Sequence, residues 1–87
     1  MIDLIRIEAA GARMLDLTFS DGAVGRWLAD AVIARDTVLT RPLNDPAYFA
    51  RAFVEAGALA WPNGLEFSAH SLHARLDQAG LLIRRAA

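Results

Sequence analysis

The chain has 87 residues, of which 55% are apolar and 22% are charged, and its formal net charge is −1 at neutral pH. This length and composition predict a single folded domain over residues 1–87 and exclude a disordered chain. A charge so close to zero offers no positive surface to a polyanion, so nucleic acid is not an expected partner by itself. The chain has no cysteine and its basic residues are all arginine, which excludes disulfides, thiol nucleophiles and a Schiff-base lysine. No apolar run is long enough to span a membrane, and Asp3 and Arg6 interrupt the start where a secretory signal would be apolar, so we expect a cytoplasmic protein with no membrane partner.

The first third of the chain predicts three antiparallel strands. Residues 13–20 alternate polar and apolar side chains with a period of two, which is typical of a strand with one buried face. Residues 4–9 alternate less strictly and form the strand before it. Asp21-Gly22 predicts a hairpin turn, because glycine readily adopts the positive φ of a tight turn, and residues 24–28 return as the third strand.

The middle of the chain predicts a short helix and a second hairpin. Residues 30–33 and 37–39 indicate a short helical turn or an irregular connector. Asp45 and Pro46 then mark a helix start, because the aspartate caps free N–H groups and proline needs no donor at the first helical position. Residues 53–54 and 58–61 form the second pair of strands.

The last part predicts a turn and a longer helix. Ser68 is the expected N-cap of a helix over residues 69–79, which Gly80 ends. Leu72 and Leu76 lie on its core-facing stripe. The predicted fold class is therefore α+β, with antiparallel β-hairpins in the order β-β-β-α-β-β-α and helices packed on one face of the sheet. Residues 81–87 form a short extra strand or a tail.

Three segments in a fixed order carry a resemblance to a known family. They are Phe19-Ser20-Asp21-Gly22, residues 42–49, and Trp61-Pro62-Asn63-Gly64-Leu65-Glu66, followed by Leu72. Together they resemble domain-of-unknown-function family 2442, a family of small bacterial proteins, and the resemblance covers nearly the whole chain. The family usually carries Asp at the position of Glu66 and often Pro at the position of Ala69. The resemblance implies an α+β fold, and because members are often encoded beside a second small protein, it implies the antitoxin-like member of a two-gene pair.

One face of the predicted last helix gathers possible metal ligands. His70, His73 and Asp77 are spaced i, i+3 and i+7, so they point the same way. That face lies opposite the apolar stripe, where solvated polar residues are expected in any case, and no fourth ligand is indicated. We therefore expect no metal and no cofactor, and keep as an alternative a small metal-dependent or acid–base enzyme that uses these three residues.

The remaining polar candidates have structural explanations. Asp21 is a typical turn residue and Asp45 is the predicted helix cap. The negative charge of Glu66 is favourable near the positive end of the last helix. The serines have no nucleophile-elbow context, and the glycines are scattered as turn residues rather than gathered in a phosphate loop. A second alternative, a nucleic-acid-binding accessory protein, lacks the basic charge it would need.

Two apolar segments are the candidates for a partner surface: Trp61-Pro62-Asn63-Gly64 and Leu81-Leu82-Ile83. Trp61 either fills the core or presents its ring to a partner, and Trp27 has the same two interpretations. The second segment either covers the core as a last strand or adds to another sheet. We expect a non-catalytic protein-interaction module whose partner is a protein encoded nearby, a second copy of the chain in a homodimer, or both. If Leu82 lies at such an interface, Leu82→Asp gives a folded monomer; if it lies in the core, the variant loses its fold.

Overall fold

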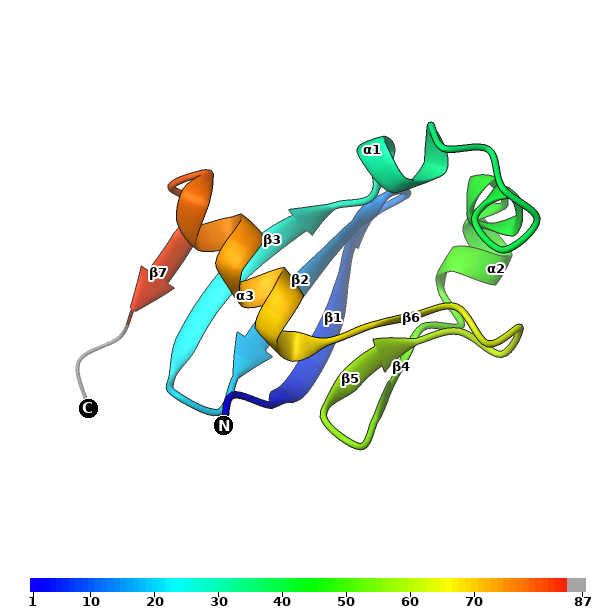
Figure 1. Ribbon diagram of the computed structural model, residues 1–87. Helices are drawn as coiled ribbons and strands as arrows, with labels where there is room; N and C mark the ends of the chain where they lie inside the picture. Colours follow the sequence, from blue (N-terminus) through cyan, green and yellow to red (C-terminus); the bar gives the residue numbers. More distant parts are fainter. Residues whose placement is uncertain (85–87) are drawn as a thin grey trace.

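Two antiparallel sheets share one core in the computed structural model, which describes residues 1–84 (Figure 1). The first sheet has the strand order β1-β2-β3-β7, and the second has the order β4-β5-β6. The strands are β1 (Leu4–Gly11), β2 (Met14–Phe19), β3 (Ala23–Leu28), β4 (Phe53–Glu55), β5 (Ala58–Ala60), β6 (Glu66–Phe67) and β7 (Leu82–Arg84). The helical segments are α1 (Asp30–Ile33), the 3-10 helix η1 (Arg41–Asn44), α2 (Pro46–Phe49) and α3 (Ala69–Gln78).

The first three strands form as their sequence patterns predict. The alternation in β2 buries Leu15, Leu17 and Phe19 on one face, and the other face stays half-exposed. The Asp21-Gly22 turn joins β2 to β3, with Gly22 at a φ of +86°. β1 pairs with β2 but its register shifts twice, once between Leu4 and Arg6 and once near Gly11. Such shifts mark β-bulges, which bend a strand and interrupt its ladder.

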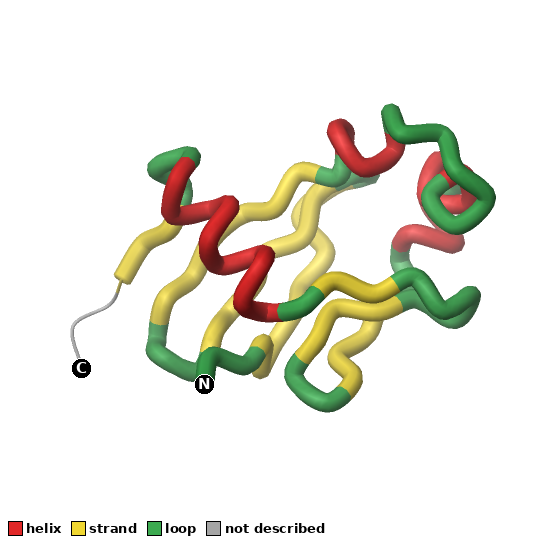
Figure 2. The backbone as a smooth tube through the Cα atoms, viewed as in Figure 1, coloured by secondary structure: helices red, strands yellow, loops and turns green. Residues whose placement is uncertain are grey.

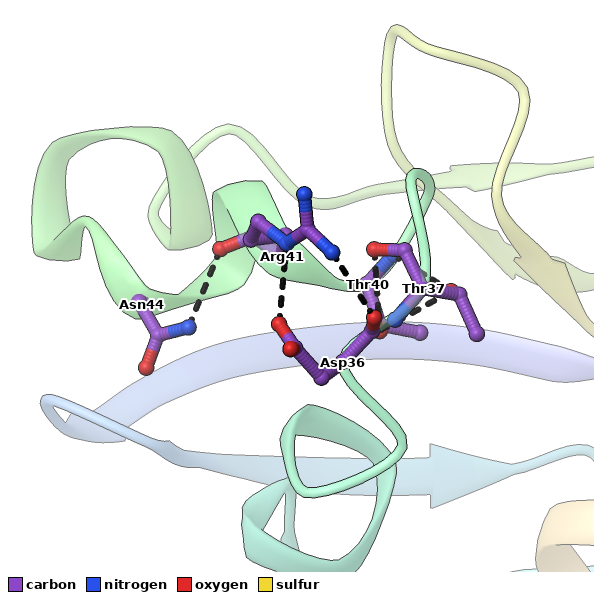
Figure 3. Close-up of polar contacts among 5 residues, drawn as sticks. All are labelled: Asp36, Thr37, Thr40, Arg41 and Asn44. Atoms are coloured by element: carbon purple, nitrogen blue, oxygen red, sulfur yellow. Dashed lines mark hydrogen bonds and ion pairs between the residues drawn. The ribbon is translucent and has the colours of Figure 1, made fainter.

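The connector after β3 is helical and internally hydrogen-bonded. Thr37 and Thr40 bond reciprocally, because each backbone N–H donates to the other's Oγ1 at 2.9 and 3.1 Å (Figure 3). Arg41 Nε donates to Asp36 Oδ1 at 2.9 Å and the Asn44 side chain donates to the Arg41 carbonyl at 3.1 Å. These hydrogen bonds stabilise the connector between β3 and α2, which contains no strand.

Both predicted helix caps are confirmed. The Asp45 side chain accepts a hydrogen bond from the Ala47 amide, with Pro46 as the first residue of α2. The Ser68 hydroxyl accepts one from the Ser71 amide at the start of α3. These side chains satisfy donors that the first turn of a helix leaves free.

α3 crosses one face of the first sheet, whereas α1, η1 and α2 gather beyond the end of that sheet (Figures 1 and 2). The close approach of α3 depends on Gly25 in β3. A Cβ at this position would lie 2.9 Å from Leu76 Cδ1 and 3.2 Å from the Leu81 carbonyl oxygen. Glycine therefore admits both α3 and the turn that leads into β7.

The predicted α+β class with antiparallel strands is confirmed, but the element order differs from the prediction. The structure adds η1 and β6, and its strands lie in two sheets rather than one. At residues 30–33, where a helical turn or an irregular connector was open, it has α1, and in the 81–87 segment, where a strand or a tail was open, it has β7; residues 85–87 of that segment lie outside the described residues. The helices do not share one face of a sheet. The physical reason is the connector, which moves β4 away from β3, so that β7 takes the place beside β3.

The core lies between α3, the two sheets and α2. Trp61 is its largest fully buried side chain, and its ring centroid lies 6.1 Å from that of Trp27 and 5.7 Å from that of Phe49. Phe67 from β6 packs on both tryptophans. This aromatic cluster joins the two sheets.

Candidate functional site

In the Trp61-Pro62-Asn63-Gly64 segment, Trp61 is buried and the next three residues are exposed. Trp61 is 1% exposed, and its indole Nε1 donates a hydrogen bond to the Phe49 carbonyl at 3.1 Å. Trp27 is 6% exposed. Of the two interpretations of each tryptophan, the structure therefore shows the core one, because neither ring lies on the surface where a partner would meet it.

The turn after Trp61 ties the connector to the core. Asn63 donates from its backbone N–H to the Tyr48 hydroxyl at 3.0 Å and from its side chain to the Leu39 carbonyl at 3.1 Å. Its Oδ1 also accepts a bond from the Leu65 amide. Pro62 and Gly64 are exposed, with Gly64 at a φ of +94°. The asparagine therefore has a structural role that holds three segments together.

His70, His73 and Asp77 do not form a common site. His70 and Asp77 are exposed, but His73 is buried, so the expectation of a fully solvated face is wrong at this residue. The last helix turns far enough toward the sheet to pack the His73 ring edge-on against Phe19, with centroids 5.0 Å apart. Within residues 1–84, no group of three or more His, Asp or Glu side chains is close enough to hold a metal ion.

His73 pairs with Asp21, which lies 52 residues earlier in the chain. His73 Nε2 is 2.9 Å from Asp21 Oδ2, and Asp21 Oδ1 accepts a bond from the Ala23 amide. The Ala23 amide is the main cause that holds the pKa of the Asp21 carboxyl below its ordinary value of 3.8; burial opposes it, and His73 and Arg84 add to it. Arg84 Nη1 lies 3.8 Å from the same carboxylate. Asp21 thus connects the β2–β3 turn, α3 and β7.

The other carboxylates remain apart from this pair. Asp45 caps α2, and Glu66 lines a separate hollow of about 580 Å³ with Ser68, His70 and the first three residues. Ser20 accepts from the Asp3 amide and Ser68 from the Ser71 amide, so both hydroxyls serve the backbone. His73 bonds to an aspartate rather than to a serine, and the described residues contain no Ser–His pair.

Most arginines are neutralised within the chain. Five of the eight arginines in residues 1–84 form ion pairs with carboxylates: Arg6, Arg13, Arg26, Arg41 and Arg84. Arg51 lies over the Tyr48 ring instead. This interleaving of charge is unlike the positive face that a nucleic-acid-binding protein presents.

The Leu81-Leu82-Ile83 segment leads into β7, which begins at Leu82, and its exposed first and third side chains flank a half-buried one. Leu82 is half-buried and packs on the core, whereas Leu81 is 47% exposed and Ile83 is 64% exposed. Ile83 lies opposite Val24 of β3. Leu82 is thus on the core side of the strand, and the outward side chains are its two neighbours.

β7 borders a shallow hollow of about 460 Å³ on the face of the first sheet opposite α3. Leu81, Val24 and Ile83 line one side, and Asp16, Glu8 and Arg26 line the other. Asp16 and Arg26 form an ion pair at 2.8 Å. The hydrogen bond from Arg26 lowers the pKa of Asp16, and burial opposes this effect. The same hydrogen bond raises the pKa of the Arg26 guanidinium. The hollow therefore has an apolar side next to the strand edge and a neutralised charged side.

Sequence reasoning missed both the Asp21–His73 pair and the role of Val24. The pair joins residues on separate elements, so no spacing signals it. Val24 was assigned to a strand, but only the register with Ile83 shows that it extends the apolar surface of β7.

Comparison of the chain with protein-family models, with curated proteins and with solved structures finds no match. None of the helices formed by residues 1–84 has the length and apolar character to cross a membrane.

Proposed function

We propose that this protein is a non-catalytic protein-interaction module that docks its partner along β7 and the apolar side of the adjoining hollow. The observation that carries the proposal is the exposure of Ile83 on β7 and of Leu81 directly before it, together with an outer edge of β7 that pairs with no other described strand. Unpaired edge strands present free N–H and C=O groups, and added strands use them for affinity while side-chain contacts supply specificity.

The contacts of His73 and Asp21 support a binding role over a catalytic one. The His73 ring and the Asp21 carboxylate bond to each other and hold three elements together. A catalytic base needs to reach a substrate proton, whereas the ring of His73 is buried against Phe19. Within residues 1–84, no group of side chains favours the metal-dependent enzyme or the nucleic-acid-binding protein.

The resemblance to family 2442 suggests that the partner is the protein encoded beside it, with this chain as the antitoxin-like member. The test is co-expression of the two proteins followed by size-exclusion chromatography, with growth rescue as a second measurement. We expect one co-eluting complex that Ile83→Asp abolishes. Ile5→Asp is the matched control, because Ile5 is 59% exposed on the opposite edge of the same sheet.

Separate elution of the two proteins with no rescue of growth contradicts the pairing with the neighbouring protein. A complex that survives Ile83→Asp but is lost in Ile5→Asp contradicts the assignment of the docking edge to β7.

A further inference from the structure

We infer that β7 also docks a second copy of this chain, through a symmetric antiparallel pairing of the two β7 strands centred on Ile83. The inference rests on the proposed docking edge and names the occupant of that edge. It follows from a comparison of the two edges of the first sheet, from the symmetry of the strand, and from the charges at the edge.

The two edges of the first sheet differ in their readiness to accept a strand. β1 has two register shifts along its length, and its Leu4 amide already donates to the Gly57 carbonyl at 2.8 Å. β7 pairs with β3 over three consecutive residues without a shift. Bulges and covering segments protect an edge from further pairing, so β7 is the regular edge, and no strand within residues 1–84 pairs with its outer side.

The short strand is self-complementary. Pairing about a two-fold axis at Ile83 places Ile83 opposite Ile83 of the second copy, and Leu82 opposite Arg84 of that copy. Antiparallel ladders alternate hydrogen-bonded and non-hydrogen-bonded pairs, and both kinds are symmetric, so the pairing satisfies the backbone in either case. On the face away from α3, the two copies of Ile83 and Val24 join into one continuous apolar row.

Charge does not oppose this arrangement. The only charged residue of β7 is Arg84, and it lies 3.8 Å from both Asp21 and Asp77. In the symmetric register it meets the second copy's Leu82 rather than a second arginine. The net charge of −1 adds little long-range repulsion between copies. Because a three-residue strand makes a small contact, the dimer belongs to the weak class of interfaces that bury less than about 1,200 Å².

The test is sedimentation equilibrium of the protein alone over a concentration series up to high micromolar. We expect a reversible monomer–dimer equilibrium for the unmodified protein and for Ile5→Asp. Ile83→Asp is expected to raise the dimer dissociation constant by roughly tenfold or more, because it buries a carboxylate opposite its own copy. Far-UV circular dichroism and fluorescence of the buried tryptophans check that the variants are folded. Leu81→Asp, which places a charge in the hollow beside Val24 and Ile83, replaces Ile83→Asp if that variant does not fold.

The outcomes separate this inference from the proposed function. A monomer at high micromolar concentration, or a dimer that Ile83→Asp leaves intact while Ile5→Asp disrupts it, overturns the inference. If the unmodified protein is monomeric but still forms the complex with its neighbouring protein through β7, the inference fails and the proposed function stands. If it is monomeric and forms no complex, both fail.

Discussion

The indole of Trp61 fills the centre of the core and also bonds to the backbone that ends α2. Loss of the indole N–H alone should destabilise the protein, because the Phe49 carbonyl would then stay buried without this donor. The segment that looked most available to a partner is thereby the one most firmly built into the molecule.

Trp61→Phe is expected to lower the free energy of unfolding by about 2 kcal/mol, from the lost hydrogen bond and the small cavity left by the indole. Urea denaturation followed by circular dichroism measures it. Trp27→Phe is the matched control, since no hydrogen bond from the Trp27 ring occurs among the described residues, and it should cost less. Equal losses would show that the bond to Phe49 contributes nothing.

The carboxyl of Asp21 predicts how stability changes in acid. Its pKa is lower in the folded protein than its ordinary value of 3.8, so the unfolded chain takes up a proton first as the pH falls. The stability that Asp21 contributes is therefore complete above pH 3.8 and is lost as the pH falls through the folded pKa.

Asp21→Asn is expected to make the unfolding free energy depend less steeply on pH below 3.8. Denaturation midpoints measured from pH 6 downward check this. Asp16→Asn should also reduce the slope, because Arg26 lowers the pKa of Asp16. An unchanged slope in Asp21→Asn would mean that the contacts of Asp21 with Ala23 and His73 do not favour its charged form.

At the scale of elements, α3 depends on its first turn. The Ser68 hydroxyl accepts the Ser71 amide at 3.1 Å, and α3 is the helix that covers the first sheet. Ser68→Ala is expected to destabilise the protein by about 1 kcal/mol, the usual cost of an N-cap. Ser71→Ala removes a hydroxyl of the same helix that makes no side-chain bond in the described structure, and thermal unfolding of the two variants should separate them. Equal melting temperatures would contradict the capping role.

The elements that the sequence predicted are those specified by local chemistry. Period-two alternation predicted β2, the Asp21-Gly22 pair its turn, and Asp45 and Ser68 the helix starts. β6 has only two residues and β7 only three, too few for a period to be visible. The connector between β3 and β4 is held by its own hydrogen bonds, and the close approach of α3 and of the turn before β7 depends on Gly25, whose contacts join residues far apart in the chain. Patterns within a short window do not contain that information.

The candidate site was predicted in part. The sequence identified the 81–83 segment, but the test residue it suggested, Leu82, faces the core side, and the outward residue is Ile83. Helical spacing grouped His73 with His70, whereas burial separates them. Spacing gives the face of a helix on which a side chain lies; only packing decides whether that face meets solvent or the turn that carries Asp21.

At the scale of the whole molecule, the histidines predict the response to chelators. His73 Nε2 is engaged by Asp21, and His70 and Asp77 are exposed apart from it. Purified, untagged protein dialysed against metal-free buffer should therefore hold less than about a tenth of an equivalent of zinc or another transition metal. Addition of a chelator should not change its melting temperature. Stoichiometric metal in elemental analysis would revive the enzyme alternative.

The bulged course of β1 has a consequence for the solubility of the folded protein. A sheet with two regular edges can add copies on both sides and grow into a fibril. In this molecule the shifts near Leu4 and Gly11, and the bond from Leu4 to Gly57, remove one of those edges. The first sheet therefore offers one regular edge, at β7. If two copies pair through it, the contact occupies that edge in both molecules, so pairing through the first sheet ends at a dimer and does not extend into a fibril.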